Sequence, residues 1–404
     1  MMRIRCGALA VAILGLSGAA QAQTYPHASE PIGSVRDMYD GKLTPESAIR
    51  TFRNIDRLFP TRLISKSAKP MPLLTASRSL DDLIFTSRGQ TFDLDQYLDS
   101  NRVSGLLVLK GGRVVLEQYR YGNSEQTRWM SMSVAKSITS TLFGAAVKQG
   151  LLSLADTVTK YVPALKGSAY EGVTVRQLLM MSSGVKWNET YTDSSSDRRH
   201  LLEAQIAQRP GALMDVMRAL PRAAPAGSVN NYSTGETQVA GEVLTGALKG
   251  RSLSDYLYER VWSRVGMEAD ANWWLDSTNG HEIAGSGFSA TLRDYGRLGQ
   301  FLLNNGIAGT DTILPSWWQA EASSPKVLTG GRPQAYGYFW WTPPTVASQR
   351  DSAYRGQGIF GQHLYINPKA KVVIVVWSAQ TRPSGGARIN DWDFFDGVVE
   401  ALKR

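Results

Sequence analysis

The chain has 404 residues, a net charge of +9, 43% hydrophobic residues and a single cysteine. This length and hydrophobic fraction are typical of a folded protein with a large core, either one large domain or two closely packed lobes. The basic residues are scattered rather than gathered into the stripe of a nucleic-acid-binding protein, and the four histidines lie far apart in the sequence. We therefore expect no nucleic-acid partner, no metal site and no cofactor.

The first 22 residues have the pattern of a secretory signal peptide. A start with two arginines leads into an apolar run over residues 7–19, and Ala20-Gln21-Ala22 is a small-residue cleavage site. We expect residues 1–22 to be removed and the protein to be periplasmic or secreted, with an uncleaved anchor as the alternative. Cleavage would remove Cys6 and with it all thiol chemistry. No later segment is long and uncharged enough to predict a membrane span.

The next part of the chain contains an extension and then a hairpin. Residues 23–88 read as an extension that wraps the main domain, with a helical pattern over residues 44–58. Two apolar, β-branched runs between Val103 and Tyr121 flank Lys110-Gly111-Gly112-Arg113. A Gly-Gly pair between such runs predicts a β-hairpin.

Helical patterns fill the centre of the chain and strand patterns return near its end. The predicted helices are 175–181 capped by Thr174, 236–247, 254–265 and 292–304, the predicted late strands are 336–341, 363–366 and 371–377, and a last helix covers 391–402. Strands at both ends of residues 89–404 predict an α+β fold, with an antiparallel sheet flanked by helices. A mainly helical lobe over roughly residues 150–305 would be inserted in it, with a cleft where the lobes meet.

The most informative motif is Ser133-Val134-Ala135-Lys136, at the start of a predicted buried helix. Side chains three residues apart share one helix face, so this serine and lysine can act together as nucleophile and base. The alternative is a capping serine followed by a lysine whose amine reaches solvent. The same spacing recurs at 183–186 and 323–326, but Gly184 and Pro325 interrupt a regular helical turn there.

Tyr232 is the candidate third member of this site. It lies in a turn-rich loop, residues 225–236, that leads into a helix, where a side chain can be held rigidly over a cleft. Beside a Lys136 ammonium its phenol pKa, ordinarily about 10, would be lowered into a useful range. Tyr232 would then take the Ser133 proton and return it to the leaving group. Other tyrosines, among them Tyr121, compete for this role, because most tyrosines are core or interface residues.

From Val103 to its end, the chain resembles the serine β-lactamase and penicillin-recognising hydrolase superfamily. Within that superfamily it is similar to the class C enzymes, the family VIII esterases and, most closely, the 6-aminohexanoate-dimer hydrolases. The resemblance is carried, in this order, by residues 131–137, 174–179 with 182–185, 231–235, 285–294 and 358–362. It implies a β-lactamase/DD-peptidase-like fold, Ser133 as the acylated nucleophile, and Lys136 and Tyr232 as its proton-transfer partners. It also implies that Tyr191 hydrogen-bonds the leaving amine.

The chain departs from this family at its third motif. No Lys-Thr-Gly is present, and Gly356-Gln357-Gly358-Ile359 takes its place without a cation to clamp the carboxylate of β-lactams and D-Ala-D-Ala peptides. Thr234 replaces the asparagine of the Tyr-x-Asn motif. Gly358 would let the backbone approach closely, and the amides of Ile359 and Ser133 are the expected oxyanion hole. A bulge at a sheet edge is the other reason for glycines here.

We therefore expect an exported serine hydrolase that cleaves amide bonds like those of 6-aminohexanoate oligomers, or ester bonds, through an acyl-enzyme. Its partner would be a small-molecule substrate, and the sequence leaves the oligomeric state open. The alternatives are a family VIII-type carboxylesterase, a weak β-lactamase, or a penicillin-binding-type sensor without turnover. Five aromatic residues near the proposed site elements would favour a slim acyl chain if they line the cleft: Trp187, Tyr191, Trp340, Trp341 and Phe360.

Overall fold

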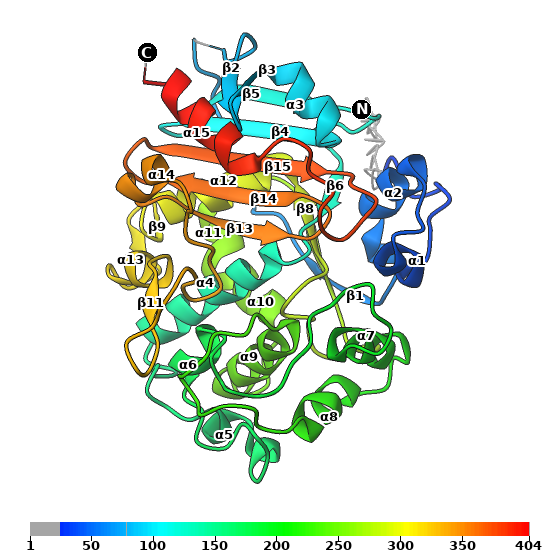
Figure 1. Ribbon diagram of the computed structural model, residues 1–404, viewed down its shortest axis with the longest axis vertical. Coiled ribbons are helices and arrows are strands. Elements are labelled where there is room, and N and C mark those ends of the chain that lie inside the picture. Colours follow the sequence, from blue (N-terminus) through cyan, green and yellow to red (C-terminus); the bar gives the residue numbers. More distant parts are fainter. Residues whose placement is uncertain (1–24, 78, 404) are drawn as a thin grey trace, which may run out of the picture.

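The computed structural model describes residues 25–77 and 79–403. Its centre is a five-stranded antiparallel sheet in the order β13-β14-β15-β4-β5 (Figure 1). The strands are β4 (Val103–Lys110), β5 (Arg113–Tyr119), β13 (Tyr354–Gly358), β14 (Gln362–Asn367) and β15 (Val372–Ser378). Two segments far apart in the sequence thus complete one sheet, as predicted, and the α+β class is confirmed.

The predicted hairpin joins β4 to β5. Lys110 pairs with Arg113 across the turn, and Gly111 and Gly112 have φ angles of 57° and 79°. The two-residue turn whose twist matches that of the strands needs a positive φ at both of its central residues. Glycine adopts a positive φ without steric cost, which explains the glycine pair.

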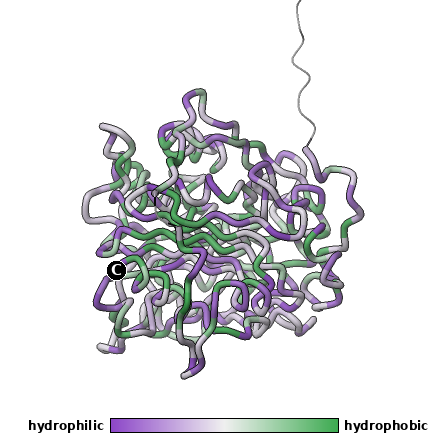
Figure 2. The backbone as a smooth tube through the Cα atoms, turned by 90° about the horizontal axis from the view of Figure 1, so that it is seen from above, coloured by the Kyte–Doolittle hydropathy of each residue, from purple (hydrophilic) through white to green (hydrophobic). Residues whose placement is uncertain are grey.

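The sheet is buried on both faces, so β4 is a continuous apolar run rather than an alternating one. Leu107 packs into the core shared with α12 (Leu292–Leu303), while Leu106 packs into a second core with α15 (Asp391–Ala401) and α3 (Leu94–Ser100). Figure 2 shows the hydrophobic segments concentrated in the middle of the molecule and hydrophilic ones in peripheral loops.

A second sheet and a group of helices lie beside the first sheet. The second sheet has the order β1 (Thr61–Ile64), β7 (Ala271–Trp274), β8 (Phe288–Thr291) and β6 (Arg128–Met130). The helices of this half are α5 (Val158–Tyr161), α6 (Val175–Leu179), α7 (Asp197–Ile206), α8 (Ala212–Ala219), α9 (Thr234–Ala247), α10 (Leu253–Leu257) and α11 (Ser263–Val265). Helix α4 (Val134–Lys148) is buried along nearly its whole length and contacts both α9 and β13, so its first turn lies between the two halves (Figure 1).

The remaining elements are short. They are α1 (Val35–Asp40), α2 (Pro45–Phe52), the hairpin of β2 (Ile84–Ser87) and β3 (Gln90–Asp93), β9 (Ile307–Ala308) with β10 (Asp311–Thr312), α13 (Trp318–Ala322), β11 (Lys326–Val327) with β12 (Pro333–Gln334), and α14 (Val346–Arg350). The extension therefore contributes two helices, an edge strand of the second sheet and the first strand of a hairpin, β2, which packs on α15.

Two predicted elements need correction. Residues 336–341 are not a strand: the Gly337 amide bonds back to Trp340 O at 2.9 Å, and Phe339 has a φ of 61°. Aromatic β-propensity suggested an extended segment, whereas the chain folds back on itself. The helix predicted over 254–265 contains a π-helical turn, Tyr258–Trp262, between α10 and α11.

The expected signal peptide, residues 1–22, lies outside the described residues. Within 25–77 and 79–403, no helix combines the length and apolar character that crossing a bilayer requires.

Candidate active site

Ser133 immediately precedes helix α4, at the junction of the two halves. Its side chain makes no capping hydrogen bond to the helix, and it is 9% exposed. The preceding residue, Met132, has a φ of 42°, a left-handed conformation that costs a non-glycine residue about 1–3 kcal/mol. Such strain persists only where the surrounding structure enforces it, so the fold holds the serine in a fixed orientation.

Lys136 lies one helical turn further on and directs its amine back to the serine. Its Nζ donates hydrogen bonds to Ser133 Oγ at 2.9 Å, Thr234 Oγ1 at 3.1 Å and Gly285 O at 2.9 Å. The side chain is 1% exposed, so the lysine does not reach solvent. Burial lowers the Lys136 pKa to about 7, because the charged amine is removed from water. Near neutral pH, a large fraction of the amine is therefore uncharged and able to accept a proton.

Tyr232 approaches the same serine from the loop before α9. Its hydroxyl lies near the Ser133 side chain, and Lys136 Nζ lies 5.3 Å from the centre of its ring. The ring stacks on Trp341 at 5.3 Å and meets Tyr336 edge-on at 5.9 Å. The structure thus brings the three predicted side chains together, and the aromatic neighbours hold the phenol in place.

The expected lowering of the Tyr232 pKa is wrong. Burial and the charge of Glu189 raise this pKa well above its usual value, and the interaction with Ser133 only partly opposes them. The expectation assumed a charged Lys136 in a solvated site, whereas both groups are buried. Burial disfavours the charged form of each, so the lysine and not the tyrosine titrates near neutral pH.

Glu189 belongs to this network although sequence reasoning gave it no role. Its Oε1 accepts a hydrogen bond from the Thr234 hydroxyl at 2.5 Å, and its Oε2 accepts from the Thr234 amide at 2.9 Å and from Trp187 Nε1 at 2.5 Å. Its position two residues before Tyr191 was the available signal, but a lone carboxylate in a loop is usually solvated. The Thr234 hydroxyl therefore links Glu189 to Lys136 through two hydrogen bonds.

The edge strand β13 passes directly against the nucleophile. A Cβ on Gly358 would lie 2.5 Å from Ser131 O and 3.0 Å from the Ser133 amide nitrogen, so only glycine fits at this position. Ile359 follows the strand, and Phe360 beyond it has a φ of 66°. The backbone around Ile359 therefore lies beside the Ser133 amide, which is the arrangement that an oxyanion hole requires.

A cavity of about 320 Å³ opens at Ser133. It is lined by Ser133, Tyr191, Tyr232, Trp341, Gln357, Gly358, Ile359, Gly361, His363, Gln380, Pro383, Ser384, Gly385, Ala387 and Asp391. Among these described lining residues, the histidine and carboxylate side chains are those of His363 and Asp391. His363 Nε2 and Asp391 Oδ2 pair at 3.1 Å. Burial lowers the His363 pKa although Asp391 opposes this, and the pKa of Asp391 is lowered as well, so this pair contributes the negative charge of Asp391 to the lining. No lysine or arginine is among these lining residues.

Tyr191 lines the cavity from a loop that the N-terminal extension contacts. Arg199 bonds to Tyr191 O at 3.2 Å and to Asp40 of α1 at 2.8 Å. The ring of Tyr39, also on α1, lies 6.3 Å from the Tyr191 ring. The extension is thus part of the structure behind the cavity wall.

Phe52 of α2 packs against the segment that follows β13. Its ring lies 5.0 Å from that of Phe360, and it is fully buried. The extension therefore supports both the Tyr191 loop and the segment after Gly358.

Only part of the predicted aromatic cluster reaches the cavity. Tyr191 and Trp341 line it, whereas Trp340 packs on Tyr354 and Trp187 bonds to Glu189. Across the part of the chain that the structure describes, no three His, Cys, Asp or Glu side chains converge as metal ligands do.

Comparison with known proteins gives the same fold. The beta-lactamase family model matches residues 93–395. A 6-aminohexanoate-dimer hydrolase from Paenarthrobacter ureafaciens is 31% identical over 348 residues, which cover 82% of this chain and 85% of that protein.

Solved structures agree. A Bacillus anthracis protein provisionally assigned as a 6-aminohexanoate-dimer hydrolase superposes with a TM-score of 0.76 at 26% identity, covering 88% of this chain and 94% of that one. A family VIII carboxylesterase shares the fold alone, with a TM-score of 0.59 at 18% identity over 77% of this chain and 94% of that one. The chain therefore belongs to the beta-lactamase family and is a hydrolase of that family.

Proposed function

We propose that this protein hydrolyses linear amides resembling the 6-aminohexanoate dimer, through an acyl-enzyme on Ser133. The observation that carries the proposal is the 2.9 Å hydrogen bond between Ser133 Oγ and a buried Lys136 whose pKa is about 7. A serine hydroxyl becomes an effective nucleophile when a neighbouring base accepts its proton. A buried lysine that is largely uncharged near neutral pH meets that need.

Proton transfer would use two groups in turn. Ser133 Oγ attacks the amide carbon while its proton moves to Lys136 Nζ. The C–N bond breaks as the leaving nitrogen takes a proton from the Tyr232 hydroxyl, and the Lys136 ammonium returns a proton to the phenolate. A water molecule then attacks the acyl carbon while Lys136 accepts its proton, and the Lys136 ammonium gives that proton to Ser133 Oγ as the bond between Ser133 and the acyl carbon breaks. The raised Tyr232 pKa supports a role as proton donor rather than as the first base.

The amides of Ser133 and Ile359 would stabilise the oxyanion. The close approach of Gly358 to the Ser133 amide supports this role, because two N–H donors must converge on one oxygen. Tyr191 would hydrogen-bond the leaving amine, which its place in the cavity wall beside Tyr232 supports.

The charges of the cavity favour amides over β-lactams. The described lining includes no lysine or arginine to hold a carboxylate next to the scissile bond, and its net charge is that of Asp391. A β-lactam would meet a carboxylate without a cationic partner, whereas the amino end of an aminohexanoate oligomer would be attracted. The identity to a 6-aminohexanoate-dimer hydrolase supports the same substrate class.

Ester hydrolysis is the second candidate activity. An alcohol or phenol leaves more readily than an amine, so the high pKa of Tyr232 hinders ester cleavage less than amide cleavage. We expect short-chain esters to be turned over by the same serine.

The test combines active-site labelling with three substrates. A fluorophosphonate probe should label the wild-type protein on Ser133 and leave Ser133→Ala unlabelled, while Ser195→Ala, at an exposed position, is labelled normally. Rates should rank the aminohexanoate dimer and a p-nitrophenyl ester well above nitrocefin. An unlabelled Ser133 would favour a sensor without turnover, and fast nitrocefin hydrolysis would overturn the substrate choice.

Export is a separate part of the proposal. The pattern of residues 1–22 supports cleavage after Ala22 and a periplasmic or secreted protein. N-terminal sequencing of the protein recovered from periplasmic and culture fractions should begin at Gln23. Recovery of intact chain in the membrane fraction would indicate the uncleaved anchor instead.

A further inference from the structure

A buried arginine lies next to the catalytic cavity without reaching its surface. Arg355 is two residues before Gln357 on the edge strand β13, and residues two apart on a strand face the same side. Gln357 lines the cavity, whereas Arg355 does not and is only 8% exposed. The guanidinium packs over the Trp392 ring of α15 at 4.2 Å. Arg355 is therefore covered, although its neighbour on the same face of the strand is part of the cavity wall.

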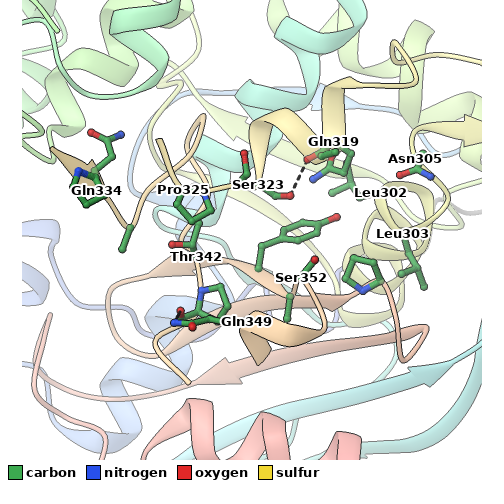
Figure 3. Close-up of a pocket in the computed structure, with 18 residues that line it drawn as sticks. Leu302, Leu303, Asn305, Gln319, Ser323, Pro325, Gln334, Thr342, Gln349 and Ser352 are labelled. Carbon is green, nitrogen blue, oxygen red and sulfur yellow. Dashed lines mark hydrogen bonds between the residues drawn. The ribbon is translucent and has the colours of Figure 1, made fainter. Parts of the chain in front are cut away.

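The other face of β13 points elsewhere. A Cβ on Gly356 would lie 2.9 Å from Ser137 Oγ of α4. Tyr354 lines a separate cavity of about 740 Å³, which shares no lining residue with the catalytic cavity (Figure 3). No Asp, Glu, Lys, Arg or His is among the residues that line this larger cavity. Of the two cavities, the catalytic one is therefore the one that Arg355 can influence.

One hydrogen bond joins the arginine to the cavity wall. Arg355 Nη2 donates to Gln357 Oε1 at 2.6 Å. A guanidinium has only donors, so the glutamine must turn its carbonyl toward the arginine and its NH₂ group away from it. Gln357 is partly exposed, and within the described residues its Nε2 has no partner and is not among the fully buried unpaired atoms. The wall thus presents a neutral N–H donor in front of a cation.

The guanidinium itself has few partners. Its Nε and Nη1 are buried without a hydrogen bond, so nothing in the cavity reaches them while Gln357 is in place. Burial lowers the Arg355 pKa to about 10, and the charge of Asp391 partly offsets this, so the group is charged at neutral pH. Among the residues that the structure describes, no carboxylate forms an ion pair with Arg355. An anion that came within contact would be held strongly, because a buried charge without a partner is costly.

Asp391 does not neutralise this arginine by direct contact. Its Oδ1 accepts hydrogen bonds from the Tyr97 hydroxyl at 2.9 Å and from Asn101 Nδ2 at 3.0 Å. Its Oδ2 pairs with His363 Nε2 at 3.1 Å. The carboxylate is thus engaged by other donors, and the positive charge of Arg355 stays available behind Gln357.

We propose that Gln357 is a specificity-determining residue, which offers the substrate a neutral donor and keeps Arg355 away from any carboxylate on the substrate. The inference rests on the proposed function, because it concerns the substrates of Ser133. In the intact protein a substrate carboxylate would meet the Gln357 amide and the Asp391 charge without a cationic partner, so neutral substrates are preferred. Shortening Gln357 would free Arg355 Nη2 and open the wall in front of it, and the preference should move toward carboxylates.

The test compares two pairs of esters, because the carboxylate can lie on either side of the scissile bond. Mono-p-nitrophenyl adipate and m-carboxyphenyl hexanoate are each measured against their neutral methyl esters. For the wild type, kcat/KM should favour the methyl ester in both pairs. Gln357→Ala should raise the relative kcat/KM of the carboxylate at least tenfold in one pair or in both, as expected for a new charge-assisted hydrogen bond.

Two further variants show whether Arg355 causes the gain. Adding Arg355→Met to Gln357→Ala should abolish it, and the double variant should stay folded, because an apolar side chain replaces a buried charge without a carboxylate partner. Thermal unfolding is measured for every variant. The matched control is Gln349→Ala, which removes a glutamine from the wall of the larger cavity (Figure 3) and should leave the selectivity unchanged.

A binding measurement separates this inference from the proposed function. Adipamate has a neutral amide at one end and a carboxylate at the other. In calorimetric titration, Gln357→Ala should bind it at least tenfold more tightly than the wild type or the double variant does. If no variant hydrolyses any ester, the proposed function fails and the titration alone decides the inference. The inference is overturned if the wild type already prefers the carboxylates, if folded Gln357→Ala gains neither activity nor binding, or if the gain survives Arg355→Met.

Discussion

Both carboxylate oxygens of Glu189 accept hydrogen bonds from Thr234, one from the hydroxyl at 2.5 Å and the other from the backbone amide at 2.9 Å. The same threonine hydroxyl accepts a hydrogen bond from Lys136 Nζ. Burial lowers the Lys136 pKa, and the charge of Glu189 partly offsets this. The protonation of the candidate base thus depends on a carboxylate from a loop that is 53 residues away in the sequence.

The pH dependence of the reaction should report the Lys136 pKa. Only the uncharged amine accepts the Ser133 proton, so activity is lost as the pH falls below the lysine pKa and is complete above it. We expect kcat/KM for a neutral p-nitrophenyl ester to rise about tenfold per pH unit in acid and to level off above about pH 7. A flat profile between about pH 5.5 and 8, or one that falls as the pH rises, would contradict a lysine base.

Glu189→Gln should move this profile toward acid. The Glu189 charge raises the Lys136 pKa, so its removal lets burial lower that pKa further. The glutamine carbonyl can accept the Thr234 hydroxyl, but its NH₂ group cannot accept the Thr234 amide and Trp187 Nε1 as Glu189 Oε2 does, so a thermal-unfolding curve is measured beside the profile. The control is Glu203→Gln, on the exposed ion pair with Arg36, whose profile should match the wild type. A midpoint that is unchanged or shifted toward base in Glu189→Gln would refute the coupling.

Tyr232→Phe should separate amide from ester cleavage. The phenylalanine ring can keep the stacking on Trp341, so the melting temperature should change little. Loss of the hydroxyl removes the donor to the leaving amine, and kcat on the aminohexanoate dimer should fall about 10²–10⁴-fold. A p-nitrophenolate leaving group needs no proton, so the loss on p-nitrophenyl esters should be at least tenfold smaller. Equal losses on both substrates would indicate that Tyr232 acts in another step.

Gly358→Ala should lower kcat strongly while it changes the thermal stability less. The new methyl group would lie 2.5 Å from Ser131 O and 3.0 Å from the Ser133 nitrogen, which forces β13 away from the nucleophile. Displacement of one oxyanion donor lowers kcat by about 10²–10³-fold in comparable sites. Rates should be measured beside a thermal-unfolding curve, and a folded variant with wild-type kcat would exclude Ile359 from the oxyanion hole.

Phe52→Ala tests the support that the extension gives to the site. Its removal from a fully buried position should lower the free energy of unfolding by about 3–5 kcal/mol. Because Phe52 packs on Phe360, kcat per folded molecule should fall as well. Phe394→Ala is the matched control, since that ring is equally buried but stacks on Tyr97 in the other core. Equal kcat in the two variants would show that Phe52 contributes stability alone.

Local patterns predicted a large share of the fold. The hairpin of β4 and β5 follows from a glycine pair between apolar runs, and the Thr174 cap is present with its reciprocal partner Gln177. These features depend on residues within a few positions of one another. Residues 336–341 fail the same approach, because the chain folds back so that Tyr336 pairs with Trp341, and only Trp341 also bridges to a strand, at Arg355 of β13.

The order of the elements and the placing of Ser133 and Lys136 on one helical turn follow from local patterns, because the helix repeat sets that relationship. Which group has a pKa near neutral follows from no local pattern, since burial and the Glu189 charge depend on segments that meet after folding. The contacts of Phe52 with Phe360 and of Asp40 with Arg199 were decided in the same way. No spacing rule joins residues so far apart; packing of the extension against the domain brings them together.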